Sequence, residues 1–113
     1  MPAPSVHVEL DVFSGRANPT WTLSADDAAE LSARVQRLRA GGEPLTEGAL
    51  GYRGFDVYRR DGEPPVLWMK VFAGTVRIEE GSQPRCYVDT AGIEQWLRDQ
   101  AVARGLGTLV GGG

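Results

Sequence analysis

SVHVELDVF, residues 5 to 13, alternates apolar and polar side chains. Successive side chains of a β-strand point to opposite faces of the sheet, so this period of two predicts a strand with one buried face and one polar face. The predicted buried face carries Val6, Val8, Leu10 and Val12, and the polar face carries Ser5, His7, Glu9 and Asp11. The rest of the fold has to cover the apolar side of this strand.

The segment that follows favours a helix on that apolar side. ADDAAELSARVQRLRA, residues 25 to 40, repeats apolar residues at helical spacing, and Ser24 stands before it as an N-cap. A pair of glycines ends this predicted helix. A second amphipathic helix is expected after Asp89 or Thr90, with its end at Gly105.

Between the two helices, the β-branched and aromatic content predicts strands at residues 52–60, 66–72, 75–79 and 85–88. Strands joined by short connections pair antiparallel, and two amphipathic helices can cover only one face of a sheet. The sequence therefore predicts a two-layer α+β sandwich with a mainly antiparallel sheet of about four to five strands. The expected order is β-α-β-β-β-(β)-α within a single domain, 1–113, that ends in a flexible tail at 106–113.

Composition narrows the class of protein. The 113 residues carry a net charge of -3 with a pI near 5.1, which argues against a nucleic-acid binder because phosphate contacts need clustered cations. Cys86 is the single cysteine, so an internal disulfide is excluded, and no apolar run is long enough to cross a bilayer. We therefore expect a cytoplasmic protein without membrane contact, and the preference for Arg, Ala and Gly suggests a small bacterial protein.

FSGRANPTW, residues 13 to 21, is the candidate recognition loop. Its glycine permits a positive φ, and its proline restricts both its own φ and the residue before it, so the loop is expected to hold one shape. Phe13, Arg16, Asn18 and Trp21 are the predicted binding residues, with Arg16 suited to grip a carboxylate or phosphate bidentately. The alternative is a compact strand-to-helix connection whose aromatics fill the core and whose Arg16 pairs with a surface acid.

The polar face of the first strand is the second candidate site. With the same period of two, Trp68, Lys70 and Phe72 of the apolar central strand are expected on that face, with Tyr58 near them. Large aromatics on an uncovered sheet imply a cover, so these four side chains are predicted to bind a second copy in a homodimer, another protein or a ligand. The alternative is an ordinary solvent-exposed face, and a register shift of one residue would exchange the two faces.

Three functional hypotheses follow, of which we favour a non-enzymatic binding or accessory module that uses the 13–21 loop and the aromatic sheet face for protein association. The alternative is a small enzyme or ligand-binding dimer, with His7, Glu9 and Asp11 as catalytic candidates and Arg16 or Lys70 as anchor for a small anionic ligand. The third is a protease inhibitor that presents Arg16. One histidine and one cysteine make a poor zinc site, so no metal and no cofactor are predicted.

Overall fold

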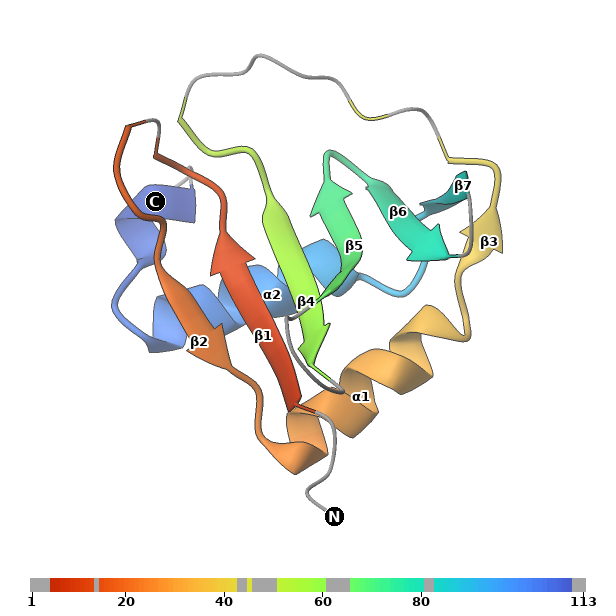
Figure 1. Cartoon of the computed structure of the whole chain (residues 1–113), viewed down its shortest axis with the longest axis horizontal. Coiled ribbons are helices and arrows are strands. Elements are labelled where there is room, and N and C mark those ends of the chain that lie inside the picture. Colours follow the sequence, from red (N-terminus) through yellow and green to blue (C-terminus); the bar gives the residue numbers. More distant parts are fainter. Residues whose placement is uncertain are drawn as a thin grey trace.

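The computed structural model describes residues 5–13, 15–42, 45, 51–60, 66–80 and 83–110. These residues form one antiparallel sheet of seven strands, in the order β2-β1-β4-β5-β6-β7-β3, and both helices lie on one face of it (Figure 1). The elements along the chain are β1 (Ser5–Leu10), β2 (Thr20–Thr22), α1 (Ala25–Val35), β3 (Arg39–Ala40), β4 (Phe55–Arg60), β5 (Val66–Phe72), β6 (Thr75–Glu80), β7 (Gln83–Val88), α2 (Ile93–Ala103) and the 3₁₀ helix η1 (Gly107–Val110).

The predicted α+β class is confirmed, whereas the predicted number of strands was too low because β2 and β3 are additional strands. Both are short and lie at the two edges of the sheet. β2 pairs with β1, so the 13–21 loop joins two strands of a hairpin rather than a strand and a helix. No helix of the described residues has the length and apolar character that a membrane span needs.

The first helix begins as predicted but ends early. The Oγ of Ser24 accepts a hydrogen bond from the backbone N–H of Asp27 at 3.1 Å, as an N-cap does. The predicted helix over 25–40 is wrong beyond Val35, because Arg39–Ala40 leaves the helix and pairs with β7. A Cβ at Gly42 would lie 2.4 Å from the carbonyl oxygen of Tyr87, so this glycine permits the close approach of the two segments.

The hydrophobic core lies between the sheet and the helices. The alternation predicted for β1 is present, with Val6, Val8 and Leu10 buried. The helices contribute the buried Leu31, Ile93, Leu97 and Ala101 to the same cluster, which also contains Phe55, Val57, Met69 and Val71 of the sheet. The open side of the sheet is thereby left to the polar residues of β1 and its neighbours.

The C-terminal segment differs from the flexible tail predicted over 106–113. Residues Gly107–Val110 form η1, and the side chain of Val110 is buried in the core cluster. The backbone N–H of Leu106 also donates to the carbonyl of Ala101 at 2.9 Å, which turns the chain back after α2. The last three residues, 111–113, lie outside the described part of the chain.

Candidate functional site

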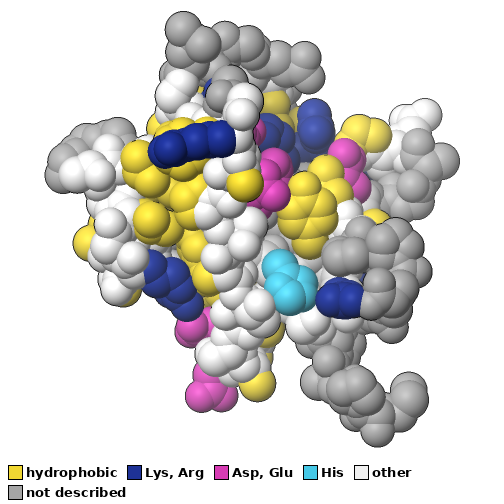
Figure 2. Space-filling view, turned by 60° about the vertical axis from the view of Figure 1, so that its left-hand side comes forward, with side chains coloured by type: hydrophobic (Ala, Val, Ile, Leu, Met, Phe, Trp, Pro, Cys, Tyr) yellow, Lys and Arg dark blue, Asp and Glu magenta, His cyan; other side chains and the backbone are white. Residues whose placement is uncertain are grey.

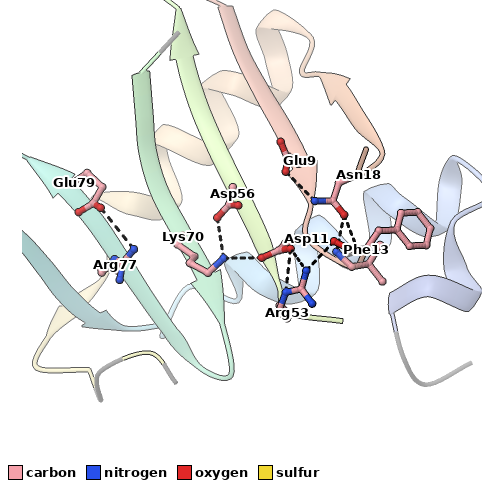
Figure 3. A network of polar contacts seen from close by, with 10 residues as sticks. Glu9, Asp11, Phe13, Asn18, Arg53, Asp56, Lys70, Arg77 and Glu79 are labelled. Atoms are coloured by element: carbon pink, nitrogen blue, oxygen red, sulfur yellow. Dashed lines mark hydrogen bonds and ion pairs between the residues drawn. The ribbon is translucent and has the colours of Figure 1, made fainter. Parts of the chain in front are cut away.

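Asn18 fixes the shape of the 13–21 loop at the end of β1. Its Oδ1 accepts hydrogen bonds from the backbone N–H groups of Val12 (3.0 Å) and Phe13 (2.7 Å), and its Nδ2 donates to Glu9 Oε2 at 3.0 Å (Figure 3). One side chain therefore ties both ends of the loop to β1. Ser14 of this loop lies outside the described residues.

Arg53, which precedes β4, braces the same loop from the other side. Its Nη2 donates to the carbonyl of Phe13 at 2.9 Å and to Asp11 Oδ1 at 2.8 Å. Asp11 Oδ2 accepts from Lys70 Nζ at 3.1 Å, and Lys70 also donates to Asp56 Oδ1 at 3.0 Å (Figure 3). A continuous network of hydrogen bonds and ion pairs thus runs from the loop, through Asp11 after β1 and Arg53 before β4, to Asp56 of β4 and Lys70 of β5.

The network shifts the pKa values of its members in opposite directions. Burial raises the pKa of Asp11, but hydrogen bonds and charge from Arg53 and Lys70 outweigh this effect and hold the pKa below its usual value. Burial lowers the pKa of Lys70, but Asp56 and Asp11 outweigh it and leave the pKa above its usual value. Each charged group is therefore stabilised in its ionised form. Lys70 is matched by two carboxylates and is a poor anchor for an anionic ligand.

Arg16 differs from the cations of this network. Its guanidinium carbon lies 3.8 Å from the centroid of the Phe13 ring, and the side chain is exposed. Among the ion pairs of the described residues, none involves Arg16, so the alternative in which it pairs with a surface acid is not what the loop adopts. The stacked guanidinium keeps its in-plane N–H donors open.

Trp21 lies at the other end of the loop and faces the helix layer. Its ring packs edge-to-face on Phe55, with centroids 6.3 Å apart, and its Nε1 donates to Gln100 Oε1 at 3.3 Å. The guanidinium of Arg104 lies over the same ring at 5.1 Å. Trp21 therefore anchors β2 to α2 and remains half-buried.

His7, Glu9 and Asp11 lie on one face, but their side chains do not converge. The Nε2 of His7 is 3.1 Å from Ser5 Oγ and its Nδ1 is 2.9 Å from Thr22 Oγ1. Glu9 bonds to Asn18, and Asp11 bonds to Arg53 and Lys70. No carboxylate orients the imidazole among these contacts, and the described residues contain no group of three His, Cys, Asp or Glu side chains arranged to hold a metal ion.

Tyr58 is the cross-strand neighbour of His7 on β4, on the open face. Burial raises the pKa of Tyr58 above its usual value, and the negative charges of Asp56 and Glu9 add to this shift. The phenol is thus held neutral beside the imidazole. Figure 2 shows the half-buried histidine beside a hydrophobic side chain, with acidic side chains farther along the same surface.

The predicted position of Trp68 on the open face is wrong. The register between β4 and β5 shifts between Val57 and Tyr58, so Val57 pairs with Met69 while Tyr58 pairs with Leu67. This bulge places an extra residue in β5 and reverses the alternation. Trp68 is 8% exposed in the core cluster with Arg59 stacked over it at 4.8 Å, whereas Leu67 takes the expected place beside Tyr58.

Phe72 lies on the same face of β5 as Lys70, because Lys70 pairs with Arg77 and Phe72 with Thr75 without a register shift between them. Its ring packs edge-to-face on Tyr52, with centroids 5.7 Å apart, and Tyr52 packs in the same way on Phe55. The hydroxyl of Tyr52 donates to Glu94 Oε2 of α2 at 2.5 Å. Tyr52 thus connects the ring of Phe72 to Phe55 and to α2. Of the aromatic side chains predicted on the open face, Trp68 therefore lies in the core, whereas Tyr58 is the neighbour of His7 on that face; the sheet-to-sheet homodimer stays a prediction.

Sequence reasoning missed Arg53, which is the central donor of the loop brace. It lies in a polar connection whose partner, Asp11, is far away in sequence. Its only local signal is the neighbouring Gly54, whose φ is +88° and whose Cβ position would lie 2.0 Å from the Val71 carbonyl oxygen. A glycine required at that point indicates a close approach of two backbone segments, but it does not indicate which neighbouring side chain forms the hydrogen bonds to the loop.

Searches with this chain found no matching protein-family model, no curated protein with significant similarity and no similar solved structure. The candidate site therefore has to be interpreted from its own geometry. In that geometry the charged side chains at the sheet form ion pairs with one another, whereas Arg16 of the loop forms no ion pair among the described residues.

Proposed function

We propose that this protein is a non-enzymatic binding module that presents the Phe13–Arg16 pair of the 13–21 loop to a partner protein bearing a carboxylate. The observation that supports the proposal is the contrast between Arg16 and the other cations of the site. Lys70 has two carboxylate partners, whereas Arg16 stacks on Phe13 and leaves its donors open. A guanidinium offered in this way matches the planar geometry of a carboxylate.

The rigidity of the loop supports recognition. Three hydrogen bonds of Asn18 and the bond from Arg53 to the Phe13 carbonyl hold the backbone on which Arg16 stands. A group that is already ordered before binding loses less conformational entropy when the complex forms. The loop therefore combines a defined shape with an unmatched positive charge.

The two rival hypotheses find less support in the contacts. An enzyme on the open face would require His7 to act with Glu9 or Asp11, yet each of those carboxylates is engaged elsewhere. A protease inhibitor would require Arg16 to extend into a deep pocket, whereas its guanidinium is folded onto the Phe13 ring. We therefore favour surface recognition of an acidic group.

Selection of random displayed peptides on the immobilised full chain tests this proposal. We expect the enriched peptides to contain Asp or Glu, and we expect Arg16→Glu to weaken their binding at least about tenfold, because it replaces a charge-assisted contact by repulsion. Asn18→Ala is expected to weaken the same peptides through loss of the loop shape.

Arg85→Glu is the matched control, because Arg85 is an exposed arginine on β7, away from the loop in the sheet order. It makes the same change in net charge and is expected to bind like the parent protein. Equal binding by the parent and the Arg16→Glu variant would refute the proposal. Inhibition of a trypsin-like protease that is lost in Arg16→Gln would instead favour the inhibitor.

A further inference from the structure

The outer edge of β2 offers backbone groups for a further strand. The carbonyl of Pro19 accepts from Leu10 N and the N–H of Leu23 donates to Val6 O, both at 2.9 Å, and Trp21 lies opposite Val8. Backbone groups alternate in direction along an antiparallel strand, so Thr20 and Thr22 point their N–H and C=O groups away from β1. β2 is the last strand of the sheet on this side, and none of the backbone bonds of the described residues involves these outward groups.

Two arginines flank this edge. Arg16 stacks on Phe13 in the loop that leads into β2, and Arg104 of α2 lies over Trp21 of β2 itself. Arg104 Nη1 donates to the backbone and side-chain oxygens of Gln100, at 3.2 and 3.3 Å, and forms no ion pair among the described residues. On the side of the molecule that carries β2, Figure 2 shows hydrophobic side chains gathered with basic side chains above and below them.

Among the described residues, acidic side chains lie near both ends of this edge: Glu9 of β1 is the cross-strand neighbour of Thr20, and its Oε2 accepts from Asn18 Nδ2 at 3.0 Å. Asp26 and Asp27 lie in the first turn of α1, after β2 has ended. Asp27 Oδ2 already accepts a hydrogen bond from Gln100 Nε2 at 3.0 Å. Glu9 and Asp27 thus each accept a hydrogen bond from a neighbouring amide, whereas Arg16 and Arg104 form no ion pair among the described residues.

From this arrangement we propose that the partner segment binds in extended form along β2, as an added strand, with acidic side chains on both sides of an apolar one. This inference rests on the proposed function and specifies the class of partner. Main-chain bonds to Thr20 and Thr22 supply affinity, as in other cases of strand addition, and the acidic side chains bind Arg16 and Arg104. The apolar side chain packs beside Trp21.

A second copy of this chain fits the edge less well. Pairing of two β2 strands about a two-fold axis brings the two copies of Arg104 toward the same junction, because each stacks on the central residue of its strand. Like charges that meet in this way oppose association. An acidic segment removes the conflict and matches both arginines.

An NMR titration with the blocked peptide Glu-Val-Phe-Val-Glu tests the inference on the full chain. In an added strand the two glutamates and the phenylalanine share one face, and the valine N–H groups point toward β2. We expect the amide signals of Thr20 and Thr22 to shift and their hydrogen exchange to slow at least about tenfold at saturation. Arg16→Gln and Arg104→Gln are each expected to weaken the peptide about three- to tenfold.

Three controls make the result specific. Arg39→Gln removes an exposed arginine from β3, at the opposite edge, and is expected to leave the affinity unchanged. The peptide Lys-Val-Phe-Val-Lys reverses the charges. The glutamate peptide with both valine nitrogens methylated keeps its side chains but cannot donate to β2. We expect both altered peptides to bind at least about tenfold more weakly.

The outcomes separate the two proposals. If Arg16→Gln weakens the glutamate peptide but methylation does not, and the Thr20 and Thr22 amides stay unchanged, the loop binds acidic groups and strand addition is wrong. If binding is insensitive to Arg16 while methylation abolishes it, the proposed function of the loop fails instead. Protection of both amides without peptide, together with a dimer in light scattering, would show that a second copy occupies the edge and would overturn the inference.

Discussion

Replacing Asn18 by Asp tests whether one amide side chain sets the shape of the loop. The introduced carboxylate still accepts from the N–H groups of Val12 and Phe13, but it cannot donate to Glu9 Oε2, which is 3.0 Å from the native nitrogen. The lost hydrogen bond costs about 1 kcal/mol, and two carboxylates at this spacing in a partly buried site repel each other by about 1–3 kcal/mol. We therefore expect the free energy of unfolding at pH 7, measured by urea denaturation, to fall by about 2–4 kcal/mol.

Glu9→Gln provides a matched rescue of this variant. Its amide oxygen can accept from Asn18, so alone it is expected to cost less than about 1 kcal/mol. Combined with Asn18→Asp, its amide nitrogen can donate to the introduced carboxylate, and the double variant is expected to recover at least about 1.5 kcal/mol. If Asn18→Asp unfolds within about 0.5 kcal/mol of the parent, or if the double variant is no more stable than Asn18→Asp, the bridge does not hold the loop.

Three further predictions concern stability. Asp11→Asn is expected to cost about 2–3 kcal/mol at pH 7. The pKa of Asp11 is held below its usual value, so its contribution is fully present above the unfolded pKa of about 3.9 and is lost as the pH falls through the folded pKa. Urea denaturation curves of parent and variant should converge in strong acid, and a constant difference would contradict this. Gly54→Ala places a Cβ 2.0 Å from the Val71 carbonyl oxygen at a φ of +88°, and we expect it to lower the free energy of unfolding by at least about 3 kcal/mol. Gly15→Ala has a similar φ of +85° but no atom near its Cβ, so its expected cost is about 1 kcal/mol. Equal shifts of the two variants in thermal melting would refute this reasoning. Tyr52→Phe removes the bond to Glu94 and is expected to cost about 1–2 kcal/mol in urea denaturation. Because burial and Glu94 raise the pKa of Tyr52 far above its usual value, an absorbance titration should show no ionisation of this residue before alkaline unfolding.

Local patterns predicted those parts of the fold that local physics determines. The alternation of β1 and the cap at Ser24 depend on residues that are neighbours in sequence, and both were found as expected. The edge strands β2 and β3 have only three and two residues, too few for a pattern to emerge. Their pairing with β1 and β7 is a tertiary contact, and for β3 it overrides the helical tendency of the segment.

In the candidate site, too, the residues that sequence analysis identified are those with a local signal. Asn18 was predicted as a binding residue of a loop that holds one shape, and that binding role stays a prediction; its hydrogen bonds reach back to Val12, Phe13 and Glu9 and hold the loop on β1. Arg53 was missed because a polar connection gives no sign of which side chain will return to Asp11. The bulge at Leu67 and Trp68 was also invisible, since an inserted residue changes the register without changing the hydrophobicity of the strand.

The bulge in β5 decides which surface of this protein is suited to binding, because it turns Trp68 away from the open face. With Trp68 turned into the core, the open face near β4 and β5 presents a network in which Asp11, Asp56 and Lys70 satisfy one another. A partner that covered this face would have to desolvate these paired charges, which costs several kcal/mol per ion unless new partners replace the water. The edge at β2 presents the opposite case, because Thr20 and Thr22 have outward backbone groups and Arg16 has open donors. Binding there replaces water on these groups by hydrogen bonds of the partner and breaks no ion pair of the described residues, and for this reason we assign recognition to the loop and the edge rather than to the face.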